Sequence, residues 1–176
     1  MNVKHLIPLT ALLLAPTLSL AAQAAGAGPP SAAPAFQRFK ALAGEWVAAE
    51  DGEMTKKGDL VARYAVTAGG TAVVETIFPG TPHEMVTVYT AEGPDVVLTH
   101  YCMVGNQPRM RAKHPSGPRF EFAFDGGANV APASDRHMHS AWVEFVGDNE
   151  LRSEWTEHAA GKPALVVKLH LVRRTS

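Results

Sequence analysis

The chain has 176 residues, of which 46% are hydrophobic, with 16 lysines and arginines against 17 aspartates and glutamates. That length suits one domain with a sizeable core once an N-terminal leader is set aside. The charge balance is close to zero and the basic residues are scattered, so nothing in the composition indicates nucleic acid as a partner, and we expect none.

The first residues have the layout of a secretory signal peptide. A single lysine in Met1 to His5 precedes an apolar run from Leu6 to Ala22, and small residues then offer cleavage sites after Ala24 or Ala27. The apolar run is short and interrupted by prolines, which disfavours an uncleaved anchor helix. We therefore assign residues 1–24 to a signal peptide and predict an exported, periplasmic protein that is not inserted in the membrane after the signal is removed.

Residues 25–35 are rich in proline, glycine and alanine and are predicted to be a linker, because their prolines disfavour both helix and sheet pairing. The folded domain is predicted to span residues 36–176. It begins with apolar residues at helical spacing between Phe36 and Leu42, which predict a short helix of about two turns that plugs or covers the fold.

Beyond this helix the hydrophobic period changes to two, and glycine- and proline-rich turns separate the alternating runs. This pattern predicts an all-β protein, a single closed antiparallel β-barrel of about ten strands with a short N-terminal helix. The predicted strands are Glu45–Ala49, Leu60–Thr67, Thr71–Phe78, Glu84–Thr90, Val96–Met103, Pro108–Ala112, Arg119–Phe124, His137–Phe145, Glu150–Glu157 and Ala164–Arg173.

Two of the predicted strands carry polar side chains that a barrel wall does not require. Alternation places His100 and Cys102 on the apolar face of one strand, and His137 and His139 on the apolar face of another. We therefore expect these four side chains to face the barrel interior, provided that no bulge shifts the register. Outward positions are predicted for Lys168 and His170, and outer-wall or rim positions for Trp142 and Trp155.

The cavity that such side chains would line favours binding of a small, partly apolar ligand, with lipid-like molecules among the candidates. Apolar walls would come from the phenylalanines of residues 119–124 and from Leu165 and Val167. The polar anchors are predicted to be His100, Asn106, Gln107, Arg109, His137 and His139, because imidazole, amide and guanidinium groups suit a carboxylate or a carbonyl.

A metal site is a second hypothesis. His137 and His139 project in the same direction roughly 6 to 7 Å apart on a strand, so they could chelate a zinc or copper ion, with His100 or Cys102 as further ligands. Four methionines, Met85, Met103, Met110 and Met138, are also compatible with copper(I), although methionine more often fills gaps in a core.

An enzyme is a third hypothesis. Glu75 and Glu84 are predicted on neighbouring strands, where a carboxylate near an imidazole would suit proton transfer. Cys102 beside His100 could act as a nucleophile, although a lone cysteine is more often a small buried hydrophobe. Glu75 could instead pair across the sheet with Arg63. The chain contains no nucleophile elbow, phosphate loop or dinucleotide-binding motif.

The segment Leu42-Ala-Gly-Glu-Trp46, which joins the predicted helix to the first strand, resembles the start of the calycin-type barrels. These include lipocalins, fatty-acid-binding proteins and nitrobindin-like haem proteins, so the resemblance adds haem to the candidate ligands. It also implies that Trp46 closes one end of the barrel and that an arginine near the C-terminus, Arg173 or Arg174, packs on its ring. The chain departs from lipocalins because its single cysteine, Cys102, cannot form an internal disulfide.

From about Phe39 to Arg173 the chain is also similar to a group of small exported bacterial proteins without an established function. The segments that carry this similarity are Val74-Glu-Thr76, Phe78-Pro-Gly-Thr-Pro-His-Glu-Met85, Thr99-His-Tyr-Cys102, Gly105-Asn-Gln-Pro-Arg-Met110 and His137-Met-His139. This resemblance implies the same fold and no particular activity.

Overall fold

The computed structural model of the chain describes Met1 and residues 34–175. Apart from Met1, the predicted signal peptide lies outside the described residues, as does the predicted linker up to residue 33. The export of the protein and its cleavage site therefore stay predictions. None of the helices among the described residues is long and apolar enough to cross a membrane.

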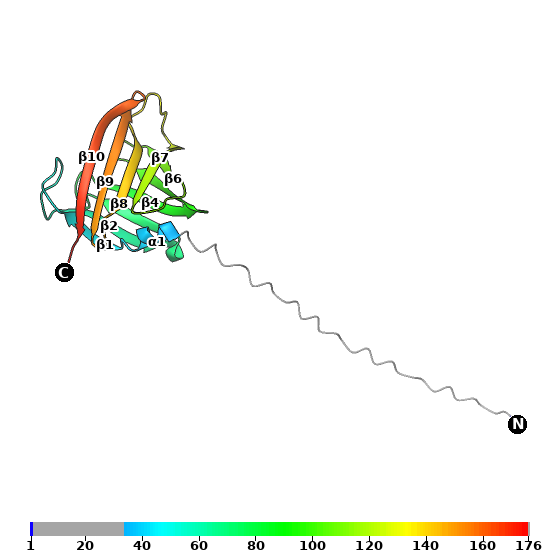
Figure 1. The fold of residues 1–176 in the computed structure, drawn as a ribbon. Helices are drawn as coiled ribbons and strands as arrows, with labels where there is room; N and C mark the ends of the chain where they lie inside the picture. Colours follow the sequence, from blue (N-terminus) through cyan, green and yellow to red (C-terminus); the bar gives the residue numbers. More distant parts are fainter. Residues whose placement is uncertain (2–33, 176) are drawn as a thin grey trace.

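Ten antiparallel strands close into a barrel, as the period-two pattern predicts (Figure 1). Each strand pairs with its neighbours in the sequence, and β1 closes the barrel against β10. The strands are β1 (Gly44–Ala48), β2 (Leu60–Thr67), β3 (Ala72–Ile77), β4 (Met85–Glu92), β5 (Asp95–Tyr101), β6 (Gln107–Ala112), β7 (Arg119–Ala128), β8 (His137–Phe145), β9 (Glu150–Ala159) and β10 (Lys162–Arg173). A single 3₁₀ turn, η1 (Ala68–Gly70), connects β2 to β3.

The predicted N-terminal helix is present as α1 (Pro34–Lys40) and fills one end of the barrel. Its two phenylalanines, Phe36 and Phe39, are completely buried. The ring of Phe39 stacks on that of Tyr89 with centroids 4.5 Å apart, and it meets the rings of three further phenylalanines, Phe120, Phe122 and Phe145. The helix is therefore held by its apolar face, since seven residues are too few to be stable alone in water.

Trp46 and Arg173 join the ends of the domain beneath α1. The indole Nε1 of Trp46 donates a hydrogen bond to the carbonyl of Leu42 at 2.8 Å, and the guanidinium of Arg173 lies 4.6 Å from the indole centroid. Arg173 also donates to the carbonyls of Ala41 and Ala43, at 2.8 Å each. Of the two arginines considered from the sequence, Arg173 is thus the one that packs on Trp46.

The alternating faces agree with the sequence over most of the barrel. Phe120 and Phe122 on β7 and Leu169 and Leu171 on β10 are buried, whereas Lys168 is exposed. One exception matters for the site. The pairing of β8 with β9 shifts between Met138 and Ser140, which is a bulge at His139.

Candidate functional site

A cavity of about 330 Å³ lies inside the barrel at the end opposite α1. Its lining comes from the ends of β3, β5 and β9 and the starts of β4, β8 and β10, which an antiparallel barrel brings to the same end. Most of the lining side chains are apolar or contain sulfur, among them Ile77, Phe78, Met85, Cys102, Met138, Trp155, Leu165, Val167 and Leu169. The predicted wall residues Leu165 and Val167 do line it, whereas Phe120 and Phe122 belong to the aromatic core around α1.

His100 is one of the polar groups of the cavity wall and is 3% exposed, which agrees with its predicted inward position. Its Nδ1 lies 2.9 Å from the hydroxyl of Thr87, directly across the β4–β5 ladder. Its Nε2 is buried and has no hydrogen-bond partner among the described residues. A buried polar atom without a partner costs about 1–3 kcal/mol, so this nitrogen is a site for a complementary group.

Burial also fixes the charge of His100. Removal from water lowers the pKa of its imidazole to about 4, so the ring is neutral at pH 7. A neutral imidazole carries one N–H, and the Thr87 hydroxyl can either donate to Nδ1 or accept from it. The free Nε2 can therefore accept or donate one hydrogen bond, depending on the tautomer.

Trp155 closes the wall beside His100, with ring centroids 5.4 Å apart. It is 5% exposed and lines the cavity, so the predicted outer-wall position of Trp155 is wrong. The sequence did carry the signal: Leu151, Ser153, Trp155 and Glu157 alternate on β9, and all four are buried. Trp142 is on the outside as predicted, where the Arg119 guanidinium lies 3.9 Å from its ring centroid.

An ion pair lies on the cavity wall. Arg136 donates two hydrogen bonds to the carboxylate of Glu157, at 2.9 and 3.2 Å. Glu157 is 4% exposed, whereas the side chain of Arg136 is 62% exposed, so the pair runs from the interior to the solvent. Sequence reasoning missed both residues because it stopped at His137 on one strand and treated Glu157 only as a strand end.

Cys102 lines the same cavity two residues after His100 and is partly buried. Its backbone lies at the β5–β6 turn, where its N–H donates to the carbonyl of Asn106 at 3.0 Å and its carbonyl accepts from Gly105. The predicted inward position of Cys102 is therefore confirmed.

Glu75 does not form a site with Glu84. The carboxylate of Glu75 is 3% exposed and accepts hydrogen bonds from the hydroxyls of Tyr64 and Tyr89, each at 2.7 Å. Burial raises the pKa of Glu75 above its usual range, and these hydrogen bonds partly offset that effect. Arg63, the alternative partner considered from the sequence, pairs with Glu45 instead.

Glu84 is not in a strand. It is exposed in the turn before β4, where its carboxylate accepts a hydrogen bond from the N–H of Gly80 at 2.6 Å. The predicted position of Glu84 on a strand next to that of Glu75 is therefore wrong.

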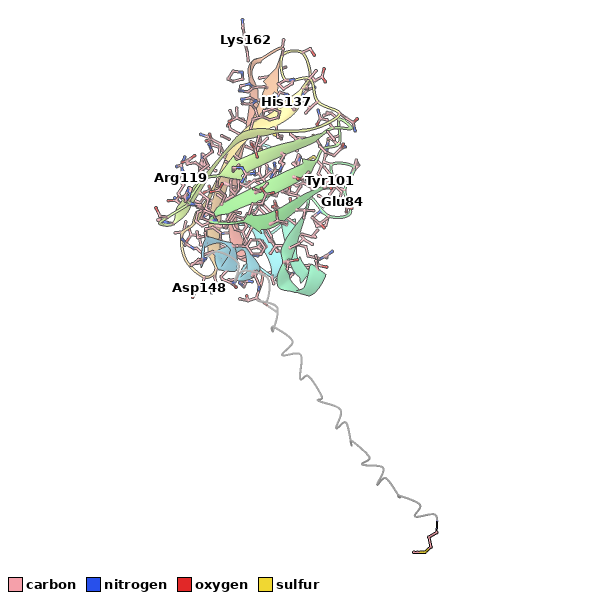
Figure 2. All side chains as sticks on the ribbon, turned by 90° about the vertical axis from the view of Figure 1, so that its right-hand side faces the viewer. Glu84, Tyr101, Arg119, His137, Asp148 and Lys162 are labelled. Carbon is pink, nitrogen blue, oxygen red and sulfur yellow. The ribbon has the colours of Figure 1, made fainter. Side chains whose placement is uncertain are left out.

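His137 and His139 do not share the cavity of His100. They lie at the bulge of β8 and join His158 of β9 in a cluster of three imidazoles, in the upper part of the molecule in Figure 2 where His137 is labelled. His137 Nε2 and His139 Nδ1 are 3.0 Å apart, and the His139 ring stacks on His158 at 3.8 Å. His137 is completely buried, as an inward position requires, but in this cluster and not in the cavity. The bulge disrupts the alternation that grouped His137 and His139 with His100, and Met138 lines the cavity in their place.

The remaining predicted anchors do not line the cavity. Asn106 is buried, and its amide N–H donates to the carbonyl of Arg136 at 2.6 Å, which ties the β5–β6 turn to the start of β8. Its Oδ1 is buried and has no hydrogen-bond partner among the described residues. Gln107 binds Gly105 and Asn129. Arg109 is on the opposite face of β6 from the buried Met110 and pairs with Glu92 and Asp125. These three residues hold turns and neighbouring strands together and do not line the cavity.

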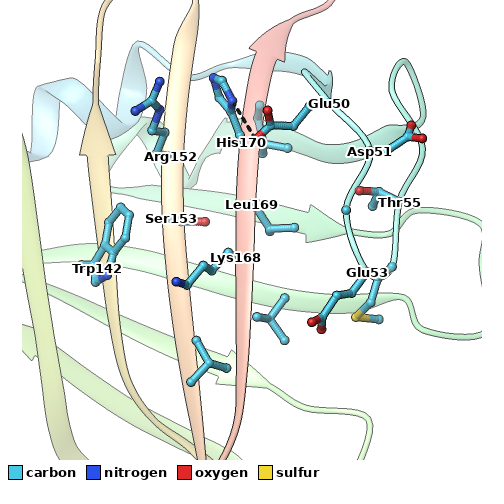
Figure 3. Close-up of a pocket in the computed structure, with 15 residues that line it drawn as sticks. Glu50, Asp51, Glu53, Thr55, Trp142, Arg152, Ser153, Lys168, Leu169 and His170 are labelled. Carbon is cyan, nitrogen blue, oxygen red and sulfur yellow. Dashed lines mark hydrogen bonds and ion pairs between the residues drawn. The ribbon is translucent and has the colours of Figure 1, made fainter.

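A second, larger hollow of about 740 Å³ lies between the loop Glu50–Thr55 and strands β8, β9 and β10 (Figure 3). Its basic side chains pair with glutamates. His170 lies 3.3 Å from Glu50 and 2.9 Å from Glu150, and Lys168 lies 3.6 Å from Glu154. Because these groups already satisfy one another, this hollow has less reason to bind a ligand than the cavity with the unpartnered His100 nitrogen.

Among the residues that the structure describes, no three histidine, cysteine, aspartate or glutamate side chains gather in a way that would hold a metal ion. The predicted set of His137, His139 and His100 is therefore not assembled. The closest approach to it is the imidazole cluster, where the parallel stacking of His139 and His158, with planes at 10°, does not point their nitrogens at a common ion.

Comparison with known proteins adds no further constraint: the chain matches no protein-family profile and no curated protein sequence.

Proposed function

We propose that the protein is an exported, calycin-like barrel that binds a small, partly apolar molecule in the cavity, with His100 as the polar anchor. The observation that carries this proposal is the buried, unpartnered Nε2 of His100 on a mainly apolar cavity wall. Specific small-molecule sites combine such walls with a few fixed polar groups.

The size of the cavity supports a small ligand. Binding pockets usually enclose about 300–1,000 Å³, and this cavity of about 330 Å³ is at the lower end of that range. A ligand of this kind has an apolar body for Trp155 and Leu169 and one oxygen for His100. A hydroxyl suits either tautomer of the imidazole, because it both donates and accepts.

The calycin-like assignment is supported by the arrangement beneath α1. There a Gly-x-Trp segment opens the first strand, its Trp46 binds the Leu42 carbonyl, and Arg173 covers the indole ring. Together with the closed antiparallel barrel, these are the features on which the resemblance to that superfamily depends.

The proposal is tested by titrating the protein with 1-octanol and with octane while following tryptophan fluorescence. Trp142→Phe removes the external indole, so the signal then comes from Trp155 and the distant Trp46. We expect both compounds to bind. His100→Phe, which keeps a ring but removes both nitrogens, should weaken octanol binding about tenfold and leave octane binding unchanged, since it removes only the hydrogen bond.

His114→Phe is the matched control, because the side chain of His114 is 75% exposed on the surface. It should change neither affinity. Failure of both compounds to bind would overturn the cavity proposal, and an unchanged octanol affinity in His100→Phe would overturn the role of His100.

Haem, the second candidate ligand, is larger than this cavity of about 330 Å³, so only the hydrogen bond between Thr87 and His100 favours it. An imidazole that ligates iron is commonly held at one nitrogen by a neighbouring group while the other is free, as His100 is. A Soret band that appears on titration with haemin and disappears in His100→Ala would support haem binding. A spectrum without that band would exclude it.

A further inference from the structure

Sulfur-containing side chains are concentrated in the cavity. The chain has six methionines and one cysteine, and four of the methionines and the cysteine line this one space. They are Met54, Met85, Met103, Met138 and Cys102. Met110, which the sequence grouped with them, is instead completely buried in the core.

Strand register brings three different donor types together on the inner wall. Thr87 is opposite His100 and Val86 is opposite Tyr101, where the β4–β5 ladder ends. Met85 and Cys102 are the next residues along the two strands, and both line the cavity. His100 is two residues before Cys102 and lines the same cavity. A thioether, a thiol and an imidazole therefore face one enclosed space.

The imidazole of this group is free to bind a metal. His100 is 3% exposed, its Nδ1 is held by Thr87, and its Nε2 has no partner among the described residues. That is the state of a metal-ligating histidine whose orientation is fixed by its other nitrogen. The unpartnered nitrogen is thus a second observation, independent of the sulfur atoms, that points to a ligand in this space.

We propose that the cavity binds a copper(I) ion through Cys102, Met85 and His100. Thiolate and thioether ligands select soft ions such as copper(I), whereas zinc sites use the histidine, cysteine and carboxylate clusters that the described residues do not form. On binding, the Cys102 thiol loses its proton to solvent and its sulfur bonds to copper. The resulting thiolate–copper(I) unit has no net charge, which suits an apolar wall.

The other methionines lead from solvent to this site. Met103 is 57% exposed and Met54 is 47% exposed, whereas Met85 is half-buried and Met138 is 9% exposed. Thioethers therefore occur at every depth, so that a soft ion meets weak ligands at the surface before it reaches the thiolate inside. This order suits uptake of copper(I) from a labile source.

The test is a competition between the purified protein and bicinchoninate for copper(I), under anaerobic conditions with ascorbate. We expect one copper(I) per chain. Cys102→Ser should weaken binding at least about a hundredfold and Met85→Leu about tenfold, since each removes one ligand. X-ray absorption of the complex should show both sulfur and nitrogen bound to copper.

Met110→Leu is the matched control, because it makes the same substitution in the core and should leave the copper affinity unchanged. Circular dichroism of each variant checks that the barrel is folded, and 1-octanol binding by Cys102→Ser checks that the cavity is intact. Absence of binding by the natural sequence, or an equal affinity in folded Cys102→Ser, would overturn the proposal.

This inference does not depend on the organic ligand. Octanol needs the cavity volume and His100 but no sulfur, so Cys102→Ser should bind octanol normally while losing copper(I). If octanol fails to bind but copper(I) binds, the proposed function fails and the metal site stands. The reverse result overturns the metal site alone.

Discussion

The indole ring of Trp155 lies beside the imidazole ring of His100, with centroids 5.4 Å apart and planes inclined by 43°. Trp155 belongs to β9 and His100 to β5, strands that are not neighbours in the barrel. The contact therefore crosses the interior, and it helps to exclude water from an imidazole that titrates far from its usual pH.

Burial of His100 should make the protein less stable in acid. The pKa of His100 falls from 6.5 to about 4 on folding, so the unfolded chain binds more protons between these values. The contribution of His100 to stability is thus complete above pH 6.5 and is lost as the pH falls to about 4, a loss of about 3 kcal/mol. Urea unfolding at pH 7 and pH 4.5 should show most of this loss of stability. In His100→Phe, which has no imidazole at this position, the free energy of unfolding should fall less between the two pH values. An imidazole resonance of His100 that titrates near pH 6.5 would contradict the prediction.

The buried carboxylate of Glu75 should contribute to the free energy of unfolding through its two hydrogen bonds. Glu75→Leu leaves the hydroxyls of Tyr64 and Tyr89 without their acceptor, which we expect to cost about 3 kcal/mol. Glu75→Gln keeps one acceptor oxygen and should cost about 1 kcal/mol. The comparison is Glu84→Gln, an exposed turn residue, with an expected change below about 0.5 kcal/mol. Urea midpoints measure all three, and equal midpoints for the two positions would contradict the assignment.

The junction beneath α1 should depend on the shape of the Arg173 side chain as well as its charge. Its guanidinium donates to the Ala41 and Ala43 carbonyls and covers the Trp46 ring, a set of contacts that a lysine ammonium cannot reproduce. Arg173→Lys is expected to lower the free energy of unfolding by about 2 kcal/mol. Arg174→Lys, where an exposed arginine pairs with Glu45, should change it by less than about 0.5 kcal/mol. Thermal or urea unfolding distinguishes the two, and a similar loss in both would show that charge alone matters.

The imidazole cluster should respond to a change in one member. Desolvation lowers the pKa of His139 and the neighbouring His158 and His137 lower it further, because two adjacent positive charges repel. His158→Gln removes one of these neighbours, so the pKa of His139 should rise towards the ordinary histidine value. The pKa of His139 in the natural protein and in the variant can be measured by following the histidine ring resonances by NMR from pH 8 to pH 5. His83→Gln, in the turn before β4, is the control and should leave the titration of His139 unchanged.

Much of the fold could be predicted from the sequence because alternation is a direct consequence of strand geometry. The ten strands were located by that period, and the inward positions of His100 and Cys102 followed from Val96 and Leu98 on the same face. The short helix was predicted because Phe36, Phe39 and Leu42 recur at helical spacing. These inferences use only neighbours in the chain, which is why they succeeded.

The site was predicted less well because it depends on contacts between distant strands. His137 is buried as predicted, but its grouping with His139 and His100 in one cavity rested on a count that one bulge invalidates. Arg109 has two acidic partners on the outer face, Glu92 and Asp125, which no local pattern reveals. The proximity of Trp155 to His100 likewise requires the barrel to be closed. Alternation placed His100 and Cys102 on the inner face correctly, but the grouping of the cavity residues required the three-dimensional register.

Four buried side chains that lie opposite one another across β2, β3, β4 and β5 have a consequence for folding. Tyr64, Glu75, Thr87 and His100 are successive partners across three ladders, and hydrogen bonds join Tyr64 to Glu75 and Thr87 to His100. A slip of two residues in any of these hairpins would keep apolar side chains inside, so hydrophobic burial alone would tolerate it. It would also leave a buried carboxylate or imidazole opposite an apolar neighbour. The buried polar groups therefore select one alignment among several that are equally hydrophobic, and they act as a check on correct assembly of this half of the barrel.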